Sequence, residues 1–496
     1  MDFLDPKKTR RLTIQLFIGY FLVTVMVVLA TAILVHYSYG YNVNRKGDLV
    51  QKGLVFVSSQ PSGARLFIDN KQIDTTNAKL NLQSGKYKLT LKRDGYRDWS
   101  RNIIVDGGDV SHYVYPLLIP NRLQTNELKT FDTAPALTSQ SPDRRWLVAL
   151  TDVNTGTFEV FDLNRKQNQV AETVSFSVPN NLMTASTGAV RWEVLEWSTN
   201  NRHMLLKRHF VAEDGTEQFE YILADRQRPD GSYNLSRELR ANPTELTLRD
   251  KKPDSYYLYD ATTKELSTAS LGEPRPVVVV KEVEAYKTHD TNTVVYATTE
   301  GAEPGKVSIK VRQRDKEHTI RNVTTSEKYL LDIARYEGDW YVVLGSQVDS
   351  RVYIYKNPVE QIQSDKKPEA LYALRLNKPI SVSFSANAQF VLTQNGKAFH
   401  IYDLENVRSY RYSAKYPVDE PQSRAQWMDS NRLTYASGGK QVIFDYDNIN
   451  RRELAPASAT YLSAFDREYR YLYTFTQNDS GALVLSSTAL RTQNDL

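Results

Sequence analysis

The chain has no cysteine among its 496 residues. A disulfide scaffold, a zinc site built on thiolates and a cysteine nucleophile are therefore excluded. The seven histidines are scattered and form neither His-x-His nor His-Glu-x-x-His. The sequence also lacks a Gly-x-Ser-x-Gly elbow, a glycine-rich phosphate loop and the EF-hand spacing. These absences favour a protein that is not an enzyme, and we expect no cofactor and no metal site.

The chain also lacks a large excess of either positive or negative charge. The 63 basic residues against 58 acidic ones leave a net charge of +5, which is too balanced to indicate a nucleic-acid partner. Hydrophobic residues make up 41% of the chain and charged residues 24%, as in ordinary folded proteins. The abundant residue is tyrosine, with 31 copies against 17 Phe and 6 Trp. Tyrosine favours β-strands and interfaces.

Only one long apolar run is present, from Leu12 to Val35, and it holds no charged residue. At about 1.5 Å per residue, a helix of this length crosses a hydrocarbon core of about 30 Å. Basic residues dominate positions 1–11, so the positive-inside rule predicts a cytoplasmic N-terminus. Tyr37, Tyr39 and Tyr41 follow the run, as in an interfacial aromatic belt. We predict a single-pass plasma-membrane protein whose bulk is extracytoplasmic, with a linker over 36–53.

Two other interpretations of the run compete with a membrane anchor. Ala30-Thr31-Ala32 is similar to a signal-peptidase site, which predicts a cleaved signal peptide. The run, however, continues through Val35 and is longer than a typical signal core. A buried helix of a soluble domain is the other alternative, and the length and purity of the run argue against it.

Residues 54–120 predict a small β-sandwich of five or six antiparallel strands. Tyr87 to Lys92 alternates apolar and polar residues with period two, which is typical of a half-buried strand. Turn residues separate the predicted strands, for example at Pro61-Ser62-Gly63 and at Gln83-Ser84-Gly85.

Four separated elements of this segment resemble the PEGA domain family. They are Pro61-Ser62-Gly63-Ala64, then Asp69-Asn70-Lys71, then Gly85-Lys86-Tyr87, and then Gly95-Tyr96. Asn70 stands where the family usually has glycine, and asparagine also tolerates the left-handed conformation. The resemblance implies an extracytoplasmic module of bacterial and archaeal surface proteins that binds or spaces. We predict a structural role for Pro61, Gly63, Ala64, Asp69, Gly85, Tyr87, Gly95 and Tyr96.

A basic and aromatic cluster in the same segment predicts a contact surface. It consists of Lys92, Arg93, Arg97, Trp99 and Arg101. Such a patch suits anionic cell-wall polymer or lipid headgroups. The alternative is a solvated loop whose charges are balanced by Asp94 and Asp98.

Residues 121–496 repeat one pattern: an apolar strand, a polar turn, a second strand, and a strand that ends in an aromatic-Asp pair. Phe161-Asp162, Tyr402-Asp403 and Phe444-Asp445 are such pairs, and the aspartate suits an Asx-turn. Eight repeat starts lie about 46 residues apart, close to the length of a propeller blade. The pattern therefore predicts a β-propeller with eight blades, or seven as the alternative; a β-solenoid and stacked sandwiches also fit.

Ring closure and turn chemistry support the propeller. The last repeat is one strand short, and a strand over 123–131 can complete it. Ser141-Pro142-Asp143-Arg144 resembles the Ser-Pro-Asp-Gly turn of WD40-like and TolB-type propellers, with arginine in place of glycine.

Three functional hypotheses follow. The first is a membrane-anchored extracytoplasmic binding or scaffold protein that presents a propeller to a protein or glycan partner. The second is a propeller enzyme that acts on envelope polysaccharide or peptide. The third is a TolB-like subunit of an envelope complex. We expect no nucleic-acid partner, and the sequence does not specify the oligomeric state.

Overall fold

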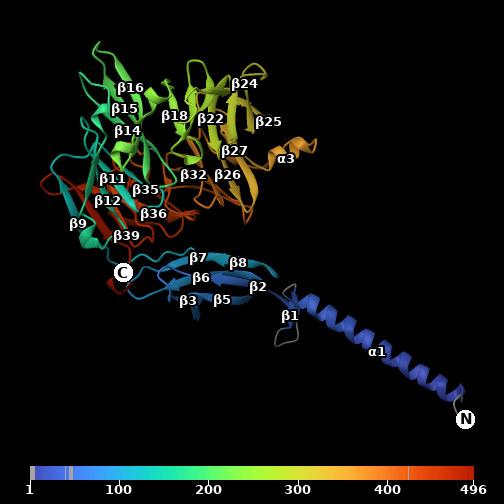
Figure 1. The fold of residues 1–496 in the computed structure, drawn as a ribbon. Helices are drawn as coiled ribbons and strands as arrows, with labels where there is room; N and C mark the ends of the chain where they lie inside the picture. Colours follow the sequence, from blue (N-terminus) through green and yellow to red (C-terminus); the bar gives the residue numbers. More distant parts are fainter. Residues whose placement is uncertain (1–5, 39–40, 44–48, 423, 496) are drawn as a thin grey trace, which may run out of the picture. The chain divides into compact units, whose positions relative to one another are not determined.

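The computed structural model describes residues 6–38, 41–43, 49–422 and 424–495 (Figure 1). Two compact units emerge, Met1–Arg122 together with Arg491–Leu496, and Leu123–Leu490. The second unit therefore ends before residue 496, whereas the sequence predicted a propeller that runs to the end. Apart from one long helix, the described chain consists mainly of β-strands, so the predicted fold class is confirmed.

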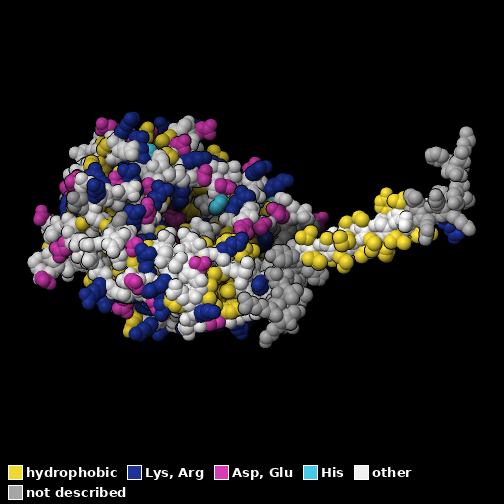
Figure 2. Space-filling model, turned by 90° about the horizontal axis from the view of Figure 1, so that it is seen from below, with side chains coloured by type: hydrophobic (Ala, Val, Ile, Leu, Met, Phe, Trp, Pro, Cys, Tyr) yellow, Lys and Arg dark blue, Asp and Glu magenta, His cyan; other side chains and the backbone are white. Residues whose placement is uncertain are grey.

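The long helix is α1 (Pro6–Ser38). Its apolar stretch, Thr13–Val35, is long enough to cross a membrane, and none of it is buried by the rest of the protein. The hydroxyls of Thr24 and Thr31 donate to carbonyls one turn back, at 2.9 and 2.8 Å, so these polar groups are satisfied within the helix. Figure 2 shows the helix as an almost continuous hydrophobic surface.

Two four-stranded sheets build the small domain. The first contains β1 (Tyr41–Val43), β2 (Leu49–Val57), β5 (Ala78–Gln83) and β8 (Val110–Tyr113). The second contains β4 (Lys71–Thr75), β3 (Arg65–Ile68), β6 (Gly85–Lys92) and β7 (Trp99–Val105). The inward positions of the two sheets form one core, which includes Val55, Leu66, Leu89, Leu91 and Trp99.

The small domain departs from the prediction in three respects. β8 pairs with β2 in parallel, whereas an all-antiparallel sandwich was predicted. β1 and the start of β2 lie inside the segment predicted as a linker, 36–53. β4 and β5 were not predicted as strands. Every residue of β4 is exposed and its sequence shows no apolar alternation, whereas β5 does alternate, with Ala78 and Leu80 buried, and this signal was missed.

The second unit consists of four-stranded antiparallel sheets, which we number sheets 1 to 8 in chain order. Sheets 1 to 7 are each built from consecutive strands, and sheet 8 combines three consecutive strands with β9. Sheets 1 to 4 are β10 (Leu137–Gln140) to β13 (Val174–Ser177), β14 (Arg191–Trp197) to β17 (Tyr233–Asn234), β18 (Glu245–Leu248) to β21 (Val277–Val280), and β22 (Val283–His289) to β25 (Lys316–Thr324). Sheets 5 to 8 are β26 (Tyr329–Tyr336) to β29 (Ala370–Arg375), β30 (Ser381–Phe384) to β33 (Arg408–Ser413), β34 (Gln426–Trp427) to β37 (Arg452–Pro456), and β38 (Ala464–Phe465) to β40 (Leu483–Ala489) with β9 (Gln124–Phe131).

The middle strands of these sheets have the following bounds. They are β11 (Trp146–Asp152), β12 (Thr157–Asp162), β15 (His203–Val211), β16 (Glu217–Asp225), β19 (Ser255–Asp260), β20 (Glu265–Ser270), β23 (Thr293–Thr298), β24 (Lys306–Gln313), β27 (Asp339–Ser346), β28 (Arg351–Lys356), β31 (Phe390–Asn395), β32 (Ala398–Asp403), β35 (Arg432–Ser437), β36 (Lys440–Asp445) and β39 (Tyr471–Gln477). Two short helices are present: α2 (Leu235–Glu238) lies in the connection from sheet 2 to sheet 3, and α3 (Pro358–Gln363) lies between β28 and β29 of sheet 5.

Successive sheets pack face to face and close a ring. Apolar side chains of sheets 1 and 2 share one core, and those of sheets 2 and 3 share the next. The last sheet packs on the first, because Leu147 and Phe161 share a core with Tyr473 and Phe475. β9 pairs with β40 as predicted, so one sheet contains strands from both ends of the ring. The unit is a β-propeller, and its closure excludes the solenoid and stacked-sandwich alternatives.

Candidate functional site

First strands of neighbouring sheets contact one another at four junctions, β10 with β14, β14 with β18, β22 with β26 and β26 with β30, so first strands line the centre of the ring. A cavity of about 560 Å³ is lined there by β10, by Trp192 to Val194 of β14, by Gln426 and by Leu462–Ser463. Propellers present ligands and partners to such a central opening, so this is the candidate site. In Figure 2 the surface is hollowed at its centre, with basic and acidic side chains around the hollow.

Charge is distributed unevenly around this centre. The first strands of sheets 2 to 5 each carry at least one acidic residue, whereas the first strands of sheets 6, 7, 8 and 1 carry no charged residue. We call these two sets the charged half and the neutral half. The acidic residues are Glu193, Glu196, Glu245, Glu284 and Asp332.

In the charged half, ionised side chains connect neighbouring sheets. Glu196 of sheet 2 accepts the backbone N–H of Leu248 at 2.9 Å and the ammonium of Lys251 at 2.7 Å. Between sheets 3 and 4, the ammonium of Lys264 lies 2.7 Å from Glu284.

Asp332 connects three sheets. Its carboxylate accepts the backbone N–H of Phe384 in sheet 6 at 3.1 Å, and the ammonium of Lys287 in sheet 4 lies 3.8 Å away. Burial raises the pKa of Asp332, while Lys287, two backbone N–H groups and His289 act in the opposite direction. Asp466, which follows the first strand of sheet 8, also has a pKa that burial raises, so Asp332 is one of two such carboxyls beside first strands.

In the neutral half, uncharged groups make the equivalent connections. The indole N–H of Trp427 donates to the hydroxyl of Ser383 at 3.2 Å, between sheets 7 and 6. The indole N–H of Trp197 donates to Ser139 at 2.9 Å, between sheets 2 and 1. The remaining two junctions are made by Ser463 with Gln441 at 2.7 Å and by Gln140 with the carbonyl of Phe465 at 2.7 Å.

Two of the three aromatic-Asp pairs end their strands in the predicted Asx-turn. Asp162 accepts the backbone N–H of Asn164 at 3.1 Å, and Asp403 accepts that of Glu405 at 3.1 Å. Asp225, which follows Ala224 and ends β16, makes the same turn with Gln227 at 3.0 Å. These aspartates therefore hold turns in place. They are not available as a set of free carboxylates.

Arg144 occupies the position where the Ser-Pro-Asp-Gly pattern has glycine, and its φ of 61° is left-handed. Its guanidinium donates to the carbonyl of Met428 in sheet 7 and lies over the ring of Tyr469 in sheet 8, 4.4 Å from the centroid. The arginine thus bridges sheets 1, 7 and 8. The cost of a left-handed residue, about 1 kcal/mol, is offset by this bridge.

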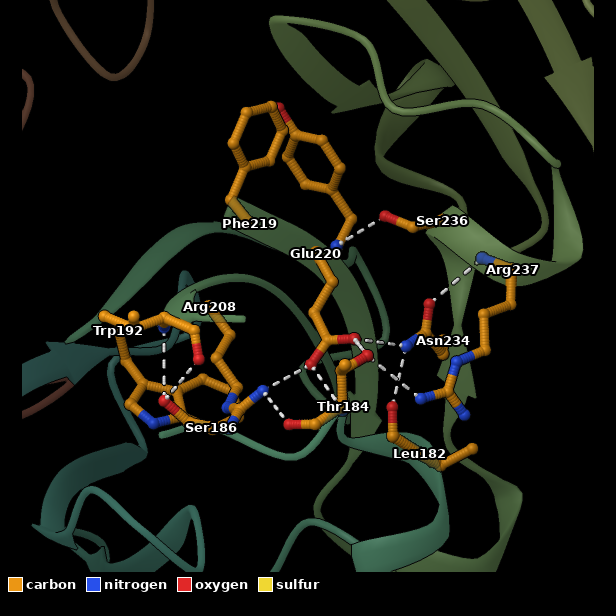
Figure 3. A network of polar contacts seen from close by, with 12 residues as sticks. Leu182, Thr184, Ser186, Trp192, Arg208, Phe219, Glu220, Asn234, Ser236 and Arg237 are labelled. Atoms are coloured by element: carbon orange, nitrogen blue, oxygen red, sulfur yellow. Dashed lines mark hydrogen bonds and ion pairs between the residues drawn. The ribbon is translucent and has the colours of Figure 1, made fainter. Parts of the chain in front are cut away.

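Sheet 2 contains a buried ion pair behind the candidate site (Figure 3). Arg208 of β15 and Glu220 of β16 lie 2.6 Å apart, and each side chain is 4% exposed. Glu220 also accepts from the hydroxyl and backbone N–H of Thr184 and from the amide of Asn234, at 2.8, 3.0 and 2.8 Å. The pair fixes the connection between sheets 1 and 2 against the long β15–β16 hairpin.

Holding a metal or activating a nucleophile depends on the geometry of the described residues. Within the described residues, no group of three or more His, Asp or Glu side chains is placed to hold a metal. The imidazole of His209 lies 3.1 Å from Glu193, and burial together with Arg191 lowers the pKa of that histidine. The structure brings no serine or threonine hydroxyl to this histidine among the hydrogen bonds that it makes.

The family-pattern residues of the small domain hold turns and core. Ala64 is fully buried, and its backbone pairs with Thr76. Gly63 and Gly95 have φ values of 76° and 84°, which explains why glycine is used there. Asp69 accepts the backbone N–H of Lys88 at 2.8 Å. The hydroxyl of Tyr87, two residues after Gly85, donates to the carbonyl of Gln83 at 2.9 Å. Pro61 begins the turn that contains Gly63, and the carbonyl of Pro61 accepts a hydrogen bond from the hydroxyl of Ser59 at 2.7 Å.

The predicted contact patch is not one uniform surface. Trp99 is 2% exposed and belongs to the core, so its assignment to a contact surface is wrong. Lys92 pairs with Asp98 at 3.1 Å, and Arg101 donates to the hydroxyl of Tyr115 at 2.6 Å. Arg97 is half-buried, and its backbone N–H bonds to Ile119.

The remaining patch residue, Arg93, binds the last residues of the chain. Asp495 accepts from Arg93 and, at 2.8 Å, from the hydroxyl of Tyr96, which is itself 4% exposed. Thr492 donates its backbone N–H to the same hydroxyl at 2.9 Å. Burial raises the pKa of Asp495, but the bonds from Tyr96 and Thr492 and the charge of Arg93 outweigh it, and the pKa is lowered. This contact has no local signature in the sequence, because Arg93 and Asp495 lie 402 positions apart.

Comparison with known proteins supports the small domain independently. Residues 52–117 match the family model described as PEGA domain. No curated protein matches the sequence.

Several solved structures are similar in fold. Porphyromonas gingivalis dipeptidyl peptidase 4 is 10% identical with a TM-score of 0.46, and the match covers 75% of this chain but only 59% of the peptidase. Kluyvelomyces marxianus Hsv2 is 11% identical with a TM-score of 0.35, over 71% of this chain and 97% of that one. An uncharacterized protein of Listeria monocytogenes EGD-e is 11% identical with a TM-score of 0.38, over 66% and 91%.

Proposed function

We propose that this chain is a membrane-anchored extracytoplasmic binding or scaffold protein that presents its propeller to a protein or glycan partner in the cell envelope. The observation that carries the proposal is the exposure of the whole apolar stretch Thr13–Val35, which no other part of the protein covers. An apolar helix of this length needs a lipid environment.

The rest of the molecule supports binding more than catalysis. The PEGA domain follows the anchor along the chain, and three of the five acidic residues on the first strands, Glu196, Glu284 and Asp332, connect neighbouring sheets. A rigid ring with a mixed polar surface suits recognition of another macromolecule. A TolB-like role is the version in which the partner is another membrane protein.

Topology is the first test. Because the chain lacks cysteine, a single introduced thiol is unique. Val174→Cys lies on the propeller at a side chain that is 65% exposed, and Lys8→Cys precedes the anchor. In intact cells, a membrane-impermeant maleimide is expected to label the Val174→Cys variant, and the Lys8→Cys variant only after permeabilisation. The reverse pattern would overturn the proposal.

The partner is tested with the full chain in detergent. Cross-linking followed by affinity purification from envelope extract is expected to recover a stoichiometric protein or a defined glycan. Recovery of a membrane protein favours the TolB-like version, and recovery of a polymer favours a glycan scaffold.

One observation favours the second candidate, an enzyme acting on envelope polysaccharide or peptide. It is the raised pKa of Asp332 beside the ring centre. Such an enzyme would release soluble fragments from isolated envelope polymer, and Asp332→Asn would abolish the release. Equal release by the parent and the Asn variant would remove this candidate.

A further inference from the structure

The two sheets of the small domain present different outer faces. On the β1-β2-β5-β8 sheet the outward positions alternate with the buried ones along each strand. They are Lys52, Leu54, Phe56 and Ser58 on β2 and the residue after it, Lys79, Asn81 and Gln83 on β5, and Val110, His112 and Val114 on β8 and its continuation. None of these ten described positions is acidic, and four of them are apolar.

These side chains form one continuous surface. Register places Leu54 beside Val110, and Phe56 between Lys79 and His112. The rings of Phe56 and His112 stack at 5.0 Å, and the ammonium of Lys79 lies 5.7 Å from the centroid of Phe56. Val110 and Val114 are 53% and 54% exposed. Apolar side chains flanked by a cation are the composition that enters the headgroup region of a bilayer.

Chain connectivity keeps this face near the end of the anchor. α1 ends at Ser38, and Tyr41 follows at most about 11 Å away, because consecutive Cα atoms are about 3.8 Å apart. Tyr41 pairs with Gln51 on the same edge of β2 on which Val110 pairs with Leu54. Gln51 and Leu54 are three positions apart along β2, which corresponds to about 10 Å. Val110 therefore lies within about 21 Å of the last helical residue, whatever the orientation of the helix.

The other sheet has a different outer face. Lys86 and Lys88 of β6 are exposed, and Arg65 and Lys92 pair with Asp94 and Asp98. The exposed apolar side chains of this sheet are Ile73 on β4 and Ile104 on β7, which are 45% and 40% exposed. β3 and β6 lie between these two strands, so the two side chains do not form one patch. This face resembles an ordinary solvated surface and provides matched control positions.

We propose that the outer face of the β1-β2-β5-β8 sheet lies on the lipid headgroups beside the membrane span. The apolar side chains of Phe56, Val110 and Val114 enter the interface, and Lys79 lies at the level of the phosphates. This inference rests on the proposed membrane anchor, and it orients the small domain with one sheet toward the bilayer.

The test uses the full chain in vesicles of phosphatidylcholine that carry a nitroxide on the acyl chain. A bimane label is attached to single cysteines in three variants: Val110→Cys on the proposed face, Ile104→Cys on the other sheet, and Val23→Cys within α1. We expect lipid quenching of the label at position 110 to be several-fold stronger than at position 104, and quenching at position 23 to be strong.

The two ways of failing are distinguishable. Strong quenching at position 23 with equally weak quenching at 110 and 104 overturns the docking face while the anchor stands; a protein partner that covers the face would give this result. Weak quenching at position 23 contradicts both the proposed membrane anchor and the proposed docking face.

A second comparison uses charge on the face itself. In the Val110→Cys background, Val114→Asp is expected to reduce quenching several-fold, because the face would have to bury a carboxylate in the interface. Ile73→Asp in the same background is the control and is expected to leave quenching unchanged. Equal effects of the two substitutions would contradict the proposal.

Discussion

The two halves of the propeller differ in the side chains that connect neighbouring sheets around the ring centre, although Lys129 and Glu159 also form an ion pair between sheets 8 and 1. Between sheets 2 and 6, carboxylates and ammonium groups connect each sheet to the next, at Glu196, Lys264 and Asp332. From sheet 6 through sheets 7 and 8 and round to sheet 2, serine, glutamine and tryptophan make the equivalent bonds. One ring geometry therefore tolerates ionic or neutral connections.

One repeated connection recurs in both halves, because Trp197 belongs to sheet 2 and Trp427 to sheet 7. Trp197 with Ser139 and Trp427 with Ser383 form the same indole-to-hydroxyl hydrogen bond between neighbouring sheets, which we call a tryptophan latch. Sheets 3 and 4, whose sequences fit the repeat least, are joined by an ion pair. Ionic connections respond to pH and salt and neutral ones do not, so the two halves can be separated experimentally.

The largest effect is expected from the buried pair of sheet 2. Glu220→Ala leaves the guanidinium of Arg208, 4% exposed, without its counter-ion. The free energy of unfolding should fall by about 3–5 kcal/mol. Urea denaturation measures it. The double variant Arg208→Met with Glu220→Leu removes both charges and should recover most of the loss; a single variant as stable as the parent would show that the pair is not buried.

A smaller effect is expected at Asp332. Asp332→Ala removes the acceptor of the Phe384 N–H, which costs about 1.5–3 kcal/mol for a bond to a charged group. Hydrogen exchange at Phe384 should rise in this variant. Asp332→Asn keeps an acceptor and is the matched control.

The difference in stability between the parent and the Asp332→Asn variant should change with pH in a definite direction. Burial raises the pKa of Asp332 above its ordinary value of 3.8, so the folded protein holds this proton more tightly than the unfolded chain. The resulting stability is complete below pH 3.8 and is lost as the pH rises through the raised pKa. Asp332→Asn should therefore gain stability relative to the parent across that window. A constant difference between the two would contradict the assignment.

The tryptophan latches should matter less. Trp427→Phe removes one hydrogen bond to Ser383, and Trp197→Phe removes the bond to Ser139. Each is expected to cost about 0.5–1.5 kcal/mol in urea denaturation. The losses should be the same at low and high salt, and a salt-dependent loss would count against a neutral latch.

The smallest effect is expected for the pair Lys264 and Glu284. Their side chains are 42% and 25% exposed, so Lys264→Met should cost less than about 1 kcal/mol. The cost should disappear at about 1 M salt, where the Debye length is about 3 Å. Thermal unfolding at two ionic strengths measures it, with Trp427→Phe as the salt-insensitive reference.

Regular features of the fold were accessible from the sequence. The apolar run, the turn residues of the small domain and the aromatic-Asp repeat each have a local physical signature, and the closing strand near 123–131 followed from a repeat that was one strand short. The parallel pairing of β2 with β8 has no such signature, because register and direction are set by packing between distant segments.

The connections around the ring were not predictable for the same reason. Asp332 and Phe384 lie 52 positions apart, and the patch residue Arg93 has its partner Asp495 402 positions away. Burial of Trp99 was also missed, since an aromatic between charged residues is equally compatible with a surface and with one buried strand position.

The closure of the ring by β9 and β40 constrains the order of events during synthesis. Thr125 and Thr488, which share a hydrogen bond in the closing sheet, are separated by 363 positions. At about 5–20 residues per second, a ribosome needs about 20 to 70 s to supply the second strand after the first. Throughout that interval β9 has no strand to pair with, while the small domain is already complete in sequence except for its last residues. A prematurely terminated chain would therefore carry an open sheet edge, which is a template for aggregation.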